Sequence, residues 1–410
     1  MPAKIEPPPW MAAEPARRVT AALTAKGQTV RFVGGCVRDA ILGREVRDID
    51  LATPDEPEAV IALLGSSGIT AIPTGVKYGT ITAIVDQDRF EVTTLRRDAE
   101  TFGRHARVEF TGDWLADAER RDFTINALYC DPDGTLYDPT GGIEDLVAGR
   151  VCFVGDAEAR IHEDYLRTLR FFRFLAWYGL TPPEPGPLAM CARLAPKIAV
   201  LSGERVAGEL LRLLEASRPA PTVALMAQHG ILEAIAPQLG DTERLGLLCQ
   251  IEDEVADQDP LRRLSALIIG KADAASSVSE RLSLSQMQKR RLETNVRSCD
   301  LVSAGMNEHA LRVALYRLDL QAVVDLLLLA FADRDHLERD LQRVQSLVAY
   351  AAAWRTPVLP INGDDLQAIG MGEGVALGDA LRDLERWWVE QDFAPDRAAL
   401  LARAWARVSG

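Results

Sequence analysis

The sequence predicts an α+β fold, in which a mixed head is followed by an all-helical remainder. The first part of the chain alternates short apolar, β-branched runs with helical patterns. From about residue 156 onward strand signals nearly vanish, and apolar residues recur at helical spacing. A chain of 410 residues is also too long for one ordinary hydrophobic core, which favours two to four domains.

The elements of the head follow from these patterns. Residues 80–85 and 89–95 are alternating or β-branched and flank Asp86-Gln87-Asp88, which indicates a hairpin. Residues 97–112 are polar with little periodicity, so we expect a mobile surface loop there. Strands are predicted at 29–33, 46–52, 80–85 and 89–95, and helices at 13–25, 36–42, 55–65 and 116–128.

The remainder of the chain is predicted to consist of helices joined by short breaks. The proline-rich stretch 181–185 separates two helices, and Pro357 and Pro360 mark another boundary, after which Asn362 is expected to cap a helix. These helices are predicted at 158–178, 187–196, 203–216, 219–228, 242–256, 260–270, 279–304, 306–316, 320–332 and 335–353. The expected domains are a flexible segment 1–14, a head 15–155, a helical neck 156–216 and a helical body 217–410.

The composition excludes several classes of protein. Hydrophobic residues make up 48% and charged residues 26% of the chain, which is ordinary for a globular protein. The apolar runs are too short to span a bilayer, and the N-terminus lacks the apolar core of a signal peptide. The six cysteines are dispersed with no CxxC pair, so we expect reduced thiols in a cytoplasmic protein and no zinc or disulfide framework.

The net charge of −14 argues mildly against nucleic-acid binding, although a local basic stripe can lie on an acidic protein. Lys289, Arg290 and Arg291 form such a cluster. It is either a solvated helix face or a contact for RNA.

Gly34 and Gly35 follow a strand-like run and precede Arg38. Glycines at a strand-to-helix turn let the backbone approach a phosphate, and a helix N-terminus and an arginine both favour that anion. The same glycines are also compatible with an ordinary tight turn. The spacing matches neither the P-loop nor the dinucleotide-binding fingerprint.

Asp48 and Asp50 stand two positions apart on a predicted strand, so their side chains share one face. Such a pair can hold magnesium, which prefers a few carboxylates together with phosphate oxygens and water. Glu91 on a neighbouring predicted strand is either a third carboxylate ligand or an exposed strand residue. With the glycine turn, the pair predicts metal-dependent chemistry on a nucleoside triphosphate.

Arg121, Asp122 and Asn126 form a further polar group. An arginine beside an aspartate is compatible with a surface salt bridge. Asn126, however, lies in an apolar context, and a buried amide needs hydrogen-bond partners. We therefore expect Asn126 to orient Asp122 or to contact a ribose.

Asp164, Arg167, Arg170 and Arg173 recur at three-residue steps, which places them in one stripe if the segment is helical. A salt-bridged surface is the simpler interpretation. Apolar residues beside the stripe favour a cleft, where an aspartate can accept from an exocyclic amine and an arginine can donate to a base edge. Such a stripe could select ATP and CTP without a nucleic-acid template.

Taken in order, these segments resemble the class II tRNA nucleotidyltransferases, the CCA-adding enzymes, whose relatives include bacterial poly(A) polymerases. The resemblance covers about residues 15–215 and rests on five motifs at 34–50, 120–127, 138–146, 163–170 and 202–205. It implies a polymerase-β-like nucleotidyltransferase head, a hinge at 138–146, and a helical neck and body that bind tRNA. It also implies CTP and ATP as substrates and two Mg²⁺ ions.

The resemblance also assigns roles to residues. These are catalysis and metal binding for Asp48 and Asp50; triphosphate binding for Gly34, Gly35 and Arg38; sugar binding for Arg121, Asp122 and Asn126; base recognition for Asp164, Arg167, Arg170 and Arg173; and a supporting role for Glu163.

Three alternatives stay open at this point. A poly(A) polymerase would share every motif, although such enzymes usually carry a basic extension, and residues 387–410 are nearly balanced in charge. Enzymes that add only CC or only A form the second alternative. A non-catalytic RNA-binding relative is disfavoured because both Asp48 and Asp50 are present. No membrane association and no obligate protein partner are predicted.

Overall fold

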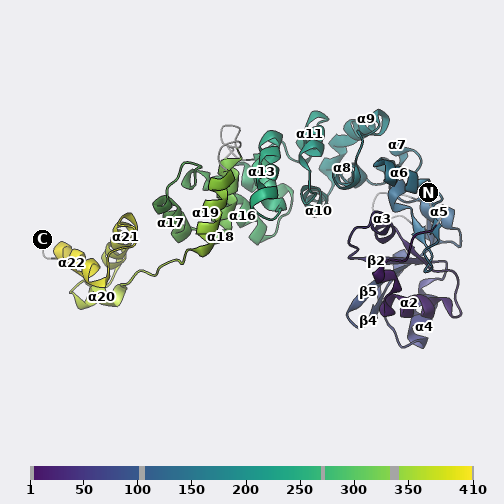
Figure 1. Cartoon of the computed structure of the whole chain (residues 1–410), viewed down its shortest axis with the longest axis horizontal. Helices are drawn as coiled ribbons and strands as arrows, with labels where there is room; N and C mark the ends of the chain where they lie inside the picture. The colour runs from purple at the N-terminus through teal and green to yellow at the C-terminus, as the bar shows by residue number, and fades with distance from the viewer. Residues whose placement is uncertain (1–3, 101–106, 269–272, 333–340, 409–410) are drawn as a thin grey trace. The chain divides into compact units, whose positions relative to one another are not determined.

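The computed structural model describes residues 4–100, 107–268, 273–332 and 341–408. It divides into two compact units, Met1–Pro237 and Gln238–Gly410 (Figure 1). The first unit contains the predicted head and neck together. Its boundary lies beyond the predicted neck end at residue 216, because the helices that follow that residue pack back onto the neck.

A seven-stranded mixed sheet forms the centre of the head (Figure 1). Its order is β3-β4-β5-β2-β1-β8-β9, and only the β2–β5 pair is parallel. The strands are β1 (Arg31–Val33), β2 (Ile49–Thr53), β3 (Thr70–Gly75), β4 (Thr80–Val85), β5 (Asp88–Thr94), β8 (Tyr129–Cys130) and β9 (Leu136–Tyr137). The predicted hairpin is confirmed, since Val85 pairs with Asp88 and Asp86 takes a positive φ of 56° at the turn.

Helices cover the sheet and set the position of the site. α2 (Glu14–Thr24) and α4 (Pro57–Ser66) pack on each other and on β4 and β5, so both lie on the same face. Val19 and Leu23, one helical turn apart on α2, are fully buried there. α3 (Gly35–Ile41) instead packs on β1 and β2, next to the start of β2.

The predicted helix over 116–128 is wrong. α5 (Trp114–Glu119) ends early, and a short 3-10 helix, η2 (Thr124–Asn126), follows after a break. Two tertiary contacts interrupt the helix. Asp117 is buried and accepts hydrogen bonds from Arg120 and Arg121, and Phe123 forms a β-bridge with Phe153.

The predicted loop over 97–112 is also wrong for the described residues. β6 (Arg96–Glu100) and β7 (Arg107–Phe110) pair as a separate two-stranded sheet, and residues 101–106 lie outside the described residues.

The N-terminal segment, which was expected to be flexible, contains regular structure. Lys4 bridges to Thr135, α1 (Pro9–Ala12) follows, and Trp10 packs edge-on against Phe32 at 5.2 Å.

The neck is helical, as predicted, but its first helix is broken. A backbone with φ −153° at Asp164 separates α7 from α8, and the Asp164 carboxylate accepts the N–H of Leu166 at 3.1 Å. From residue 142 to the end of the first unit, the helices are α6 (Gly142–Ala148), α7 (Ala157–Glu163), α8 (Leu166–Tyr178), α9 (Pro185–Leu194), η3 (Ala195–Val200), α10 (Gly203–Leu214), α11 (Ala220–Gln228) and α12 (Ile231–Ile235). α10 and α11 both pack on α8.

The described part of the second unit consists of helices: α13 (Thr242–Val255), α14 (Pro260–Ile268), α15 (Ala274–Arg281), α16 (Gln286–Arg297), η4 (Cys299–Leu301), α17 (Glu308–Arg317), α18 (Leu320–Phe331), α19 (Leu341–Ala353), α20 (Gly363–Ala368), α21 (Val375–Glu390) and α22 (Arg397–Val408). The single helix predicted over 279–304 is wrong, because Ser283 takes a φ of 50° and Ser285 starts α16 with a capping box. The predicted cap at Asn362 is confirmed. Residues 335–340 of the last predicted helix lie outside the described residues.

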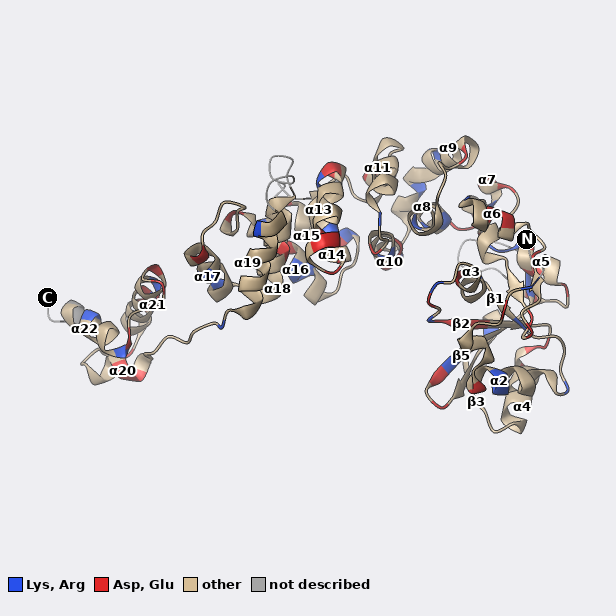
Figure 2. Ribbon diagram, in the orientation of Figure 1, with Lys and Arg blue, Asp and Glu red and all other residues tan. Residues whose placement is uncertain are grey.

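A buried ionic network joins α13, α14, α16 and α18, where the ribbon carries charges of both signs (Figure 2). Asp325 is fully buried and accepts from Arg262 at 3.0 Å and from Arg291 at 2.7 Å. Glu252 accepts from Arg262 at 2.7 Å and from Arg263 at 2.6 Å.

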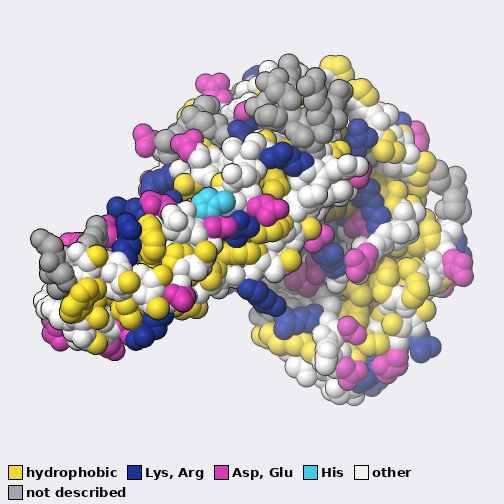
Figure 3. Space-filling view, turned by 60° about the vertical axis from the view of Figure 1, so that its left-hand side comes forward, with side chains coloured by type: hydrophobic (Ala, Val, Ile, Leu, Met, Phe, Trp, Pro, Cys, Tyr) yellow, Lys and Arg dark blue, Asp and Glu magenta, His cyan; other side chains and the backbone are white. Residues whose placement is uncertain are grey.

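On the surface, Lys and Arg side chains lie interspersed with Asp and Glu side chains across the face shown in Figure 3. In the described residues, no helix is long and apolar enough to cross a membrane.

We expect Asp325→Ala to lower the free energy of unfolding by about 3–5 kcal/mol, because the buried Arg262 and the half-buried Arg291 lose this partner. Asp319→Ala on the same helix removes only an N-cap, whose carboxylate accepts the N–H of Ala322 at 2.8 Å, and should cost about 1 kcal/mol. Urea denaturation of both variants measures the difference. Equal losses would show that the buried network contributes no more than a helix cap.

Candidate functional site

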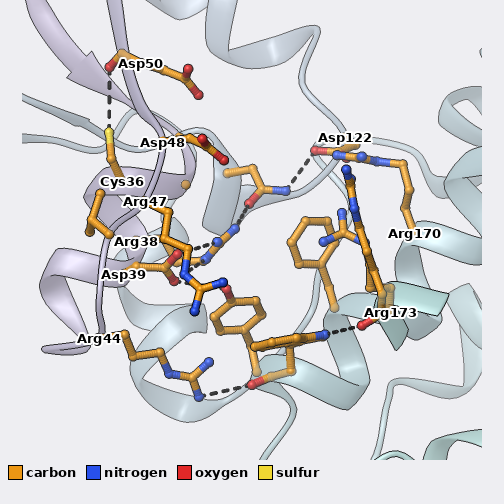
Figure 4. A pocket seen from close by; sticks show the side chains of 18 of the residues that line it. Cys36, Arg38, Asp39, Arg44, Arg47, Asp48, Asp50, Asp122, Arg170 and Arg173 are labelled. Atoms are coloured by element: carbon orange, nitrogen blue, oxygen red, sulfur yellow. Dashed lines mark hydrogen bonds and ion pairs between the residues drawn. The ribbon is translucent and has the colours of Figure 1, made fainter. Parts of the chain in front are cut away.

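One cavity of the first unit, about 670 Å³ in volume, brings most of the predicted site residues together (Figure 4). They come from the β1–α3 turn, the start of β2, the segment before η2, and α8. Its lining includes Gly34, Gly35, Arg38, Asp48, Asp50, Arg121, Asp122, Asn126, Arg170 and Arg173. The volume lies in the range of small-molecule sites.

The acidic pair lies close together at one side of this cavity (Figure 4). Asp50 is on β2, Asp48 directly precedes the strand, and the parallel register places Glu91 beside Asp50. Neither Asp48 nor Asp50 forms a side-chain hydrogen bond or salt bridge within the described ranges. Burial, then Glu91, and to a smaller degree Asp48 raise the pKa of Asp50 to about 6, while Arg121 opposes the shift.

These carboxylates fit a divalent cation. They repel one another, and no side chain pairs with Asp48 or Asp50 among the described residues, which is the arrangement that a bound cation would relieve. The described residues contain no group of three His, Cys, Asp or Glu that would hold a metal alone. The remaining ligands would therefore come from water and substrate phosphates. Glu91 is exposed and does not line the cavity, so its role as a ligand stays a prediction.

The glycine turn has a conformation that requires glycine at Gly34. Its φ of 75° and ψ of −124° are disfavoured for other residues, and its N–H donates to the carbonyl of Leu128 at 2.9 Å. A Cβ at this position would lie 3.6 Å from Nη1 of Arg121. The turn therefore places the start of α3 beside Arg121.

Arg38 is buried in the cavity wall, and each of its three guanidinium nitrogens donates one hydrogen bond. It donates to Asp39 at 3.0 and 2.9 Å and to Asn126 at 2.6 Å, and it stacks on Tyr178 at 4.2 Å. A direct contact between Arg38 and a triphosphate stays a prediction.

Asp122 is held from two sides. Asn126 donates to its Oδ1 at 3.1 Å, which is the contact expected of an orienting amide, and Arg170 donates to its Oδ2 at 2.6 Å. Burial alone would raise the pKa of Asp122, but Arg170 and Asn126 outweigh it and lower the pKa. Asp122 is therefore an anion fixed between the head and α8.

Arg121 is held by a residue that the sequence reasoning missed. Asp117 is 1% exposed and accepts from Arg121 at 3.0 Å, from Arg120 at 2.6 Å and from the Tyr129 hydroxyl at 2.7 Å. Burial would raise the pKa of Asp117, but Arg121 and Arg120 bring it down to about 2. The three- and four-residue spacing from Asp117 to the arginine pair was the available signal.

Asp164 and Arg167 do not line this cavity. Asp164 pairs with Arg205 at 2.5 Å and lines a separate hollow of about 630 Å³, which Glu163 also lines. Arg167 pairs with Glu163 and donates to the carbonyl of Arg160 at 2.9 Å. Of the predicted stripe, only Arg170 and Arg173 reach the cavity, and base recognition by Asp164 and Arg167 stays a prediction.

Other lining residues were not predicted. Arg44 and Arg47 lie in the loop just before Asp48, so their position in the sequence was a usable signal. Arg44 stacks on Tyr178 at 4.7 Å and donates to the carbonyl of Trp177 at 3.1 Å. Trp177, Tyr178 and Arg212 also line the cavity.

The basic cluster of the second unit is only partly available to a ligand. Arg291 pairs with Asp325 at 2.7 Å and with Asp259 at 2.8 Å, so it belongs to the buried network. Lys289 lies 3.6 Å from Glu280, and Arg290 is exposed.

We expect Asp117→Asn to lower the free energy of unfolding by about 3 kcal/mol at pH 7, because two arginines lose their buried partner. The folded-state pKa of about 2 lies below the ordinary 3.8. The Asp117 contribution is therefore full above about pH 4 and is lost as the pH falls through about 2. Urea denaturation at pH 7 and at pH 3 should show a smaller difference from the wild type at pH 3. An undiminished difference would contradict the ion-pair explanation.

Two sequence families match parts of the chain. The family described as "Poly A polymerase head domain" matches residues 30–152, and that described as "Probable RNA and SrmB- binding site of polymerase A" matches residues 184–242. The first match lies within the predicted head, and the second begins within the predicted neck.

The chain is also similar to whole proteins. It is 35% identical over 387 residues to "CCA tRNA nucleotidyltransferase 1, mitochondrial" of Danio rerio, covering 91% of this chain and 86% of the relative. It is 31% identical over 393 residues to the "CCA-adding enzyme" of Limosilactobacillus fermentum, covering 95% and 96%. The structure of the Bacillus stearothermophilus CCA-adding enzyme in complex with CTP has the same fold, with a TM-score of 0.75, 24% identity and coverage of 97% and 98%. The chain therefore belongs to the CCA-adding enzyme and poly(A) polymerase family and is a nucleotidyltransferase.

Proposed function

We propose that this protein adds C, C and A to the 3′ end of tRNA from CTP and ATP, without a nucleic-acid template, and releases diphosphate. The observation that carries the proposal is the cavity itself, where the unpaired carboxylates of Asp48 and Asp50 face a wall that contains arginines. Whole-chain similarity to enzymes named for CCA addition supports the choice of reaction.

In the proposed reaction, the 3′-hydroxyl oxygen of the RNA forms a bond to the α-phosphorus of the nucleotide. The bond between that phosphorus and the bridging oxygen breaks, and diphosphate leaves with the electron pair, while the hydroxyl proton passes to water. Asp48 and Asp50 would hold the metal ions, which we propose are two Mg²⁺, and these would supply activation of the hydroxyl and neutralisation of the leaving diphosphate.

The chain's own residues orient the nucleotide and balance its charge. Arginines outnumber acidic residues in the cavity lining, so a triphosphate is attracted there. Arg121 is fixed by Asp117 beside the glycine turn, where it can donate to a phosphate or to the sugar. Asp122 and Asn126 are the proposed sugar contacts, and Gly34, Gly35 and Arg38 the proposed triphosphate contacts.

The residues proposed for base selection divide between two hollows. Arg170 and Arg173 line the cavity, whereas Asp164 and Arg167 lie in or beside the neighbouring hollow. We propose that Asp164 and Arg167 contact the base when nucleotide is bound, with Glu163 supporting Arg167 through its ion pair. The helices of the second unit are the proposed binding surface for the tRNA body.

Poly(A) addition is the second candidate, because the match to the "Poly A polymerase head domain" spans residues 30–152. The relatives that match most of this chain favour CCA addition instead, since their names refer to it. We also propose a reducing compartment such as the cytoplasm, which is supported by six cysteines that are all free thiols.

The reaction can be tested with purified protein, Mg²⁺, a tRNA that lacks its 3′ CCA, and CTP and ATP supplied singly and together. We expect two added residues with CTP alone and three with both nucleotides. Asp50→Ala should lower kcat by at least about a thousandfold, because the metal ions lose a ligand. Asp88→Ala, which removes an exposed carboxylate at the start of β5, is the matched control and should behave as the wild type.

Two outcomes of this assay would contradict the proposal. Long tails with ATP alone would establish poly(A) addition instead. Full activity of Asp50→Ala would remove the acidic pair from the mechanism.

The RNA role of the basic cluster can be separated from its structural role. Arg290 is exposed, so Arg290→Glu should weaken tRNA binding, about three- to tenfold at 50 mM salt, without changing the unfolding midpoint. Arg291→Glu should destabilise the protein, because Arg291 is part of the buried network. Fluorescence anisotropy with labelled tRNA and thermal unfolding measure both. Unchanged affinity in Arg290→Glu would show that the cluster is only a solvated face.

A further inference from the structure

Glu209, a buried glutamate on the neck helix α10, contacts two arginines of the cavity without lining the cavity itself. It is 5% exposed. Its Oε2 accepts from Nε of Arg173 at 2.6 Å, and its Oε1 accepts from Nη1 of Arg170 at 3.4 Å. The two arginines stand three residues apart on α8 and both line the cavity. Glu209 therefore holds them from the side that faces away from the cavity.

Glu209 is the outer end of a longer series of hydrogen bonds. Arg170 continues to Asp122 at 2.6 Å, Asp122 accepts from Asn126 at 3.1 Å, and Asn126 accepts from Arg38 at 2.6 Å. Figure 4 shows Arg170 beside Asp122 at the cavity wall. A change in the position of Arg170 is therefore transmitted to the groups proposed to hold the nucleotide.

The two arginines depend on Glu209 unequally. Arg170 has Asp122 as a second acidic partner. Among the described residues, Glu209 is the single acidic partner of Arg173, and Phe174 packs under its guanidinium at 4.1 Å. Without the carboxylate, two like charges would face each other in a half-buried setting, and Arg173 would swing toward solvent or into the cavity.

We propose that Glu209 is a positioning residue for nucleotide binding, which fixes Arg170 and Arg173 in the orientation that the nucleotide requires. This inference rests on the proposed function, because it takes the cavity to be the nucleotide site. Glu209 touches no substrate itself and acts through the two guanidinium groups.

The second unit provides a matched control. Glu252 is 1% exposed and also accepts from two arginines, Arg262 at 2.7 Å and Arg263 at 2.6 Å. None of these three residues lines the cavity. Glu252→Gln therefore removes the same charge from the same kind of contact at a place that has no part in nucleotide binding.

The experiment compares Glu209→Gln, Glu209→Asp and Glu252→Gln with the wild type, using CTP and ATP with Mg²⁺ and no RNA. We expect Glu209→Gln to raise the Kd of both nucleotides about tenfold, because two charge-assisted hydrogen bonds lose their anion. Glu209→Asp keeps the carboxylate and should recover part of the loss. Glu252→Gln should lower the unfolding midpoint while its nucleotide Kd stays within about twofold of the wild type.

A double variant extends the test. Because Glu209 is proposed to act through Arg173 as well as Arg170, Glu209→Gln and Arg173→Gln should be non-additive, with the double variant binding CTP no more weakly than Glu209→Gln alone. If Glu209→Gln alone does not fold, the double variant, which lacks the uncompensated charge of Arg173, is compared with Arg173→Gln instead and should bind CTP more weakly, because Arg170 has lost Glu209.

Two results would overturn the inference. One is a Glu209→Gln variant that unfolds earlier, as Glu252→Gln does, but binds both nucleotides like the wild type. The other is a double variant whose loss is the product of the two single losses. Failure of the proposed function is recognised separately, as a wild type that binds nucleotide without extending tRNA.

Discussion

The ion pair between Arg170 and Asp122 is the contact on which the site depends, because it joins the head to the neck helix α8. From Asp122, hydrogen bonds lead through Asn126 to Arg38 on α3. The neighbouring Asp39 then accepts from the hydroxyl of Tyr178, back on α8, at 3.0 Å. The contacts thus form a closed ring along one wall of the cavity. Since breaking any buried ion pair leaves a charge without its partner, the ring holds α8 and the head at one spacing.

The acidic pair of the cavity, Asp48 and Asp50, differs from the arginines in its lack of ion-pair partners within the part of the chain that the structure describes. Arg38, Arg121 and Arg170 have their charges matched by aspartates, whereas Asp48 and Asp50 lack such partners among the described residues. A protein folded for stability alone would not keep a carboxylate such as Asp50, whose pKa is raised by burial and by its acidic neighbours. In the proposed function this charge is matched by metal ions that arrive with the nucleotide. The arginine wall is then the preformed part of the site, and the substrate completes the rest.

Features set by local spacing could be predicted from the sequence. Asp48 and Asp50 both line the cavity, as their two-residue spacing predicted, although the strand predicted over 46–52 begins only at Ile49. Gly34 precedes a helix where its turn was expected. The errors have tertiary causes. The helix predicted through Arg121 is broken because a buried aspartate binds the arginines. The next predicted helix is interrupted at Asp164, whose backbone is extended and whose carboxylate accepts the N–H of Leu166. Glu209 was missed because its partners stand 36 and 39 positions away, where sequence spacing carries no signal.

The two buried glutamates show why burial and charge alone do not identify a functional residue. Glu209 and Glu252 each contact two arginines, and both sets of contacts stabilise the packing of helices. The distances are 3.4 and 2.6 Å for Glu209 and 2.7 and 2.6 Å for Glu252. The arginines of Glu252 are enclosed on all sides, so their positions matter only to the fold. Those of Glu209 line a cavity, so their positions also determine what the cavity can bind. In a chain of net charge −14, attraction for a triphosphate cannot come from the protein as a whole. In the proposed function it comes from arginines concentrated in one cavity and held there by buried carboxylates, which is the arrangement that Glu209 and Asp117 provide.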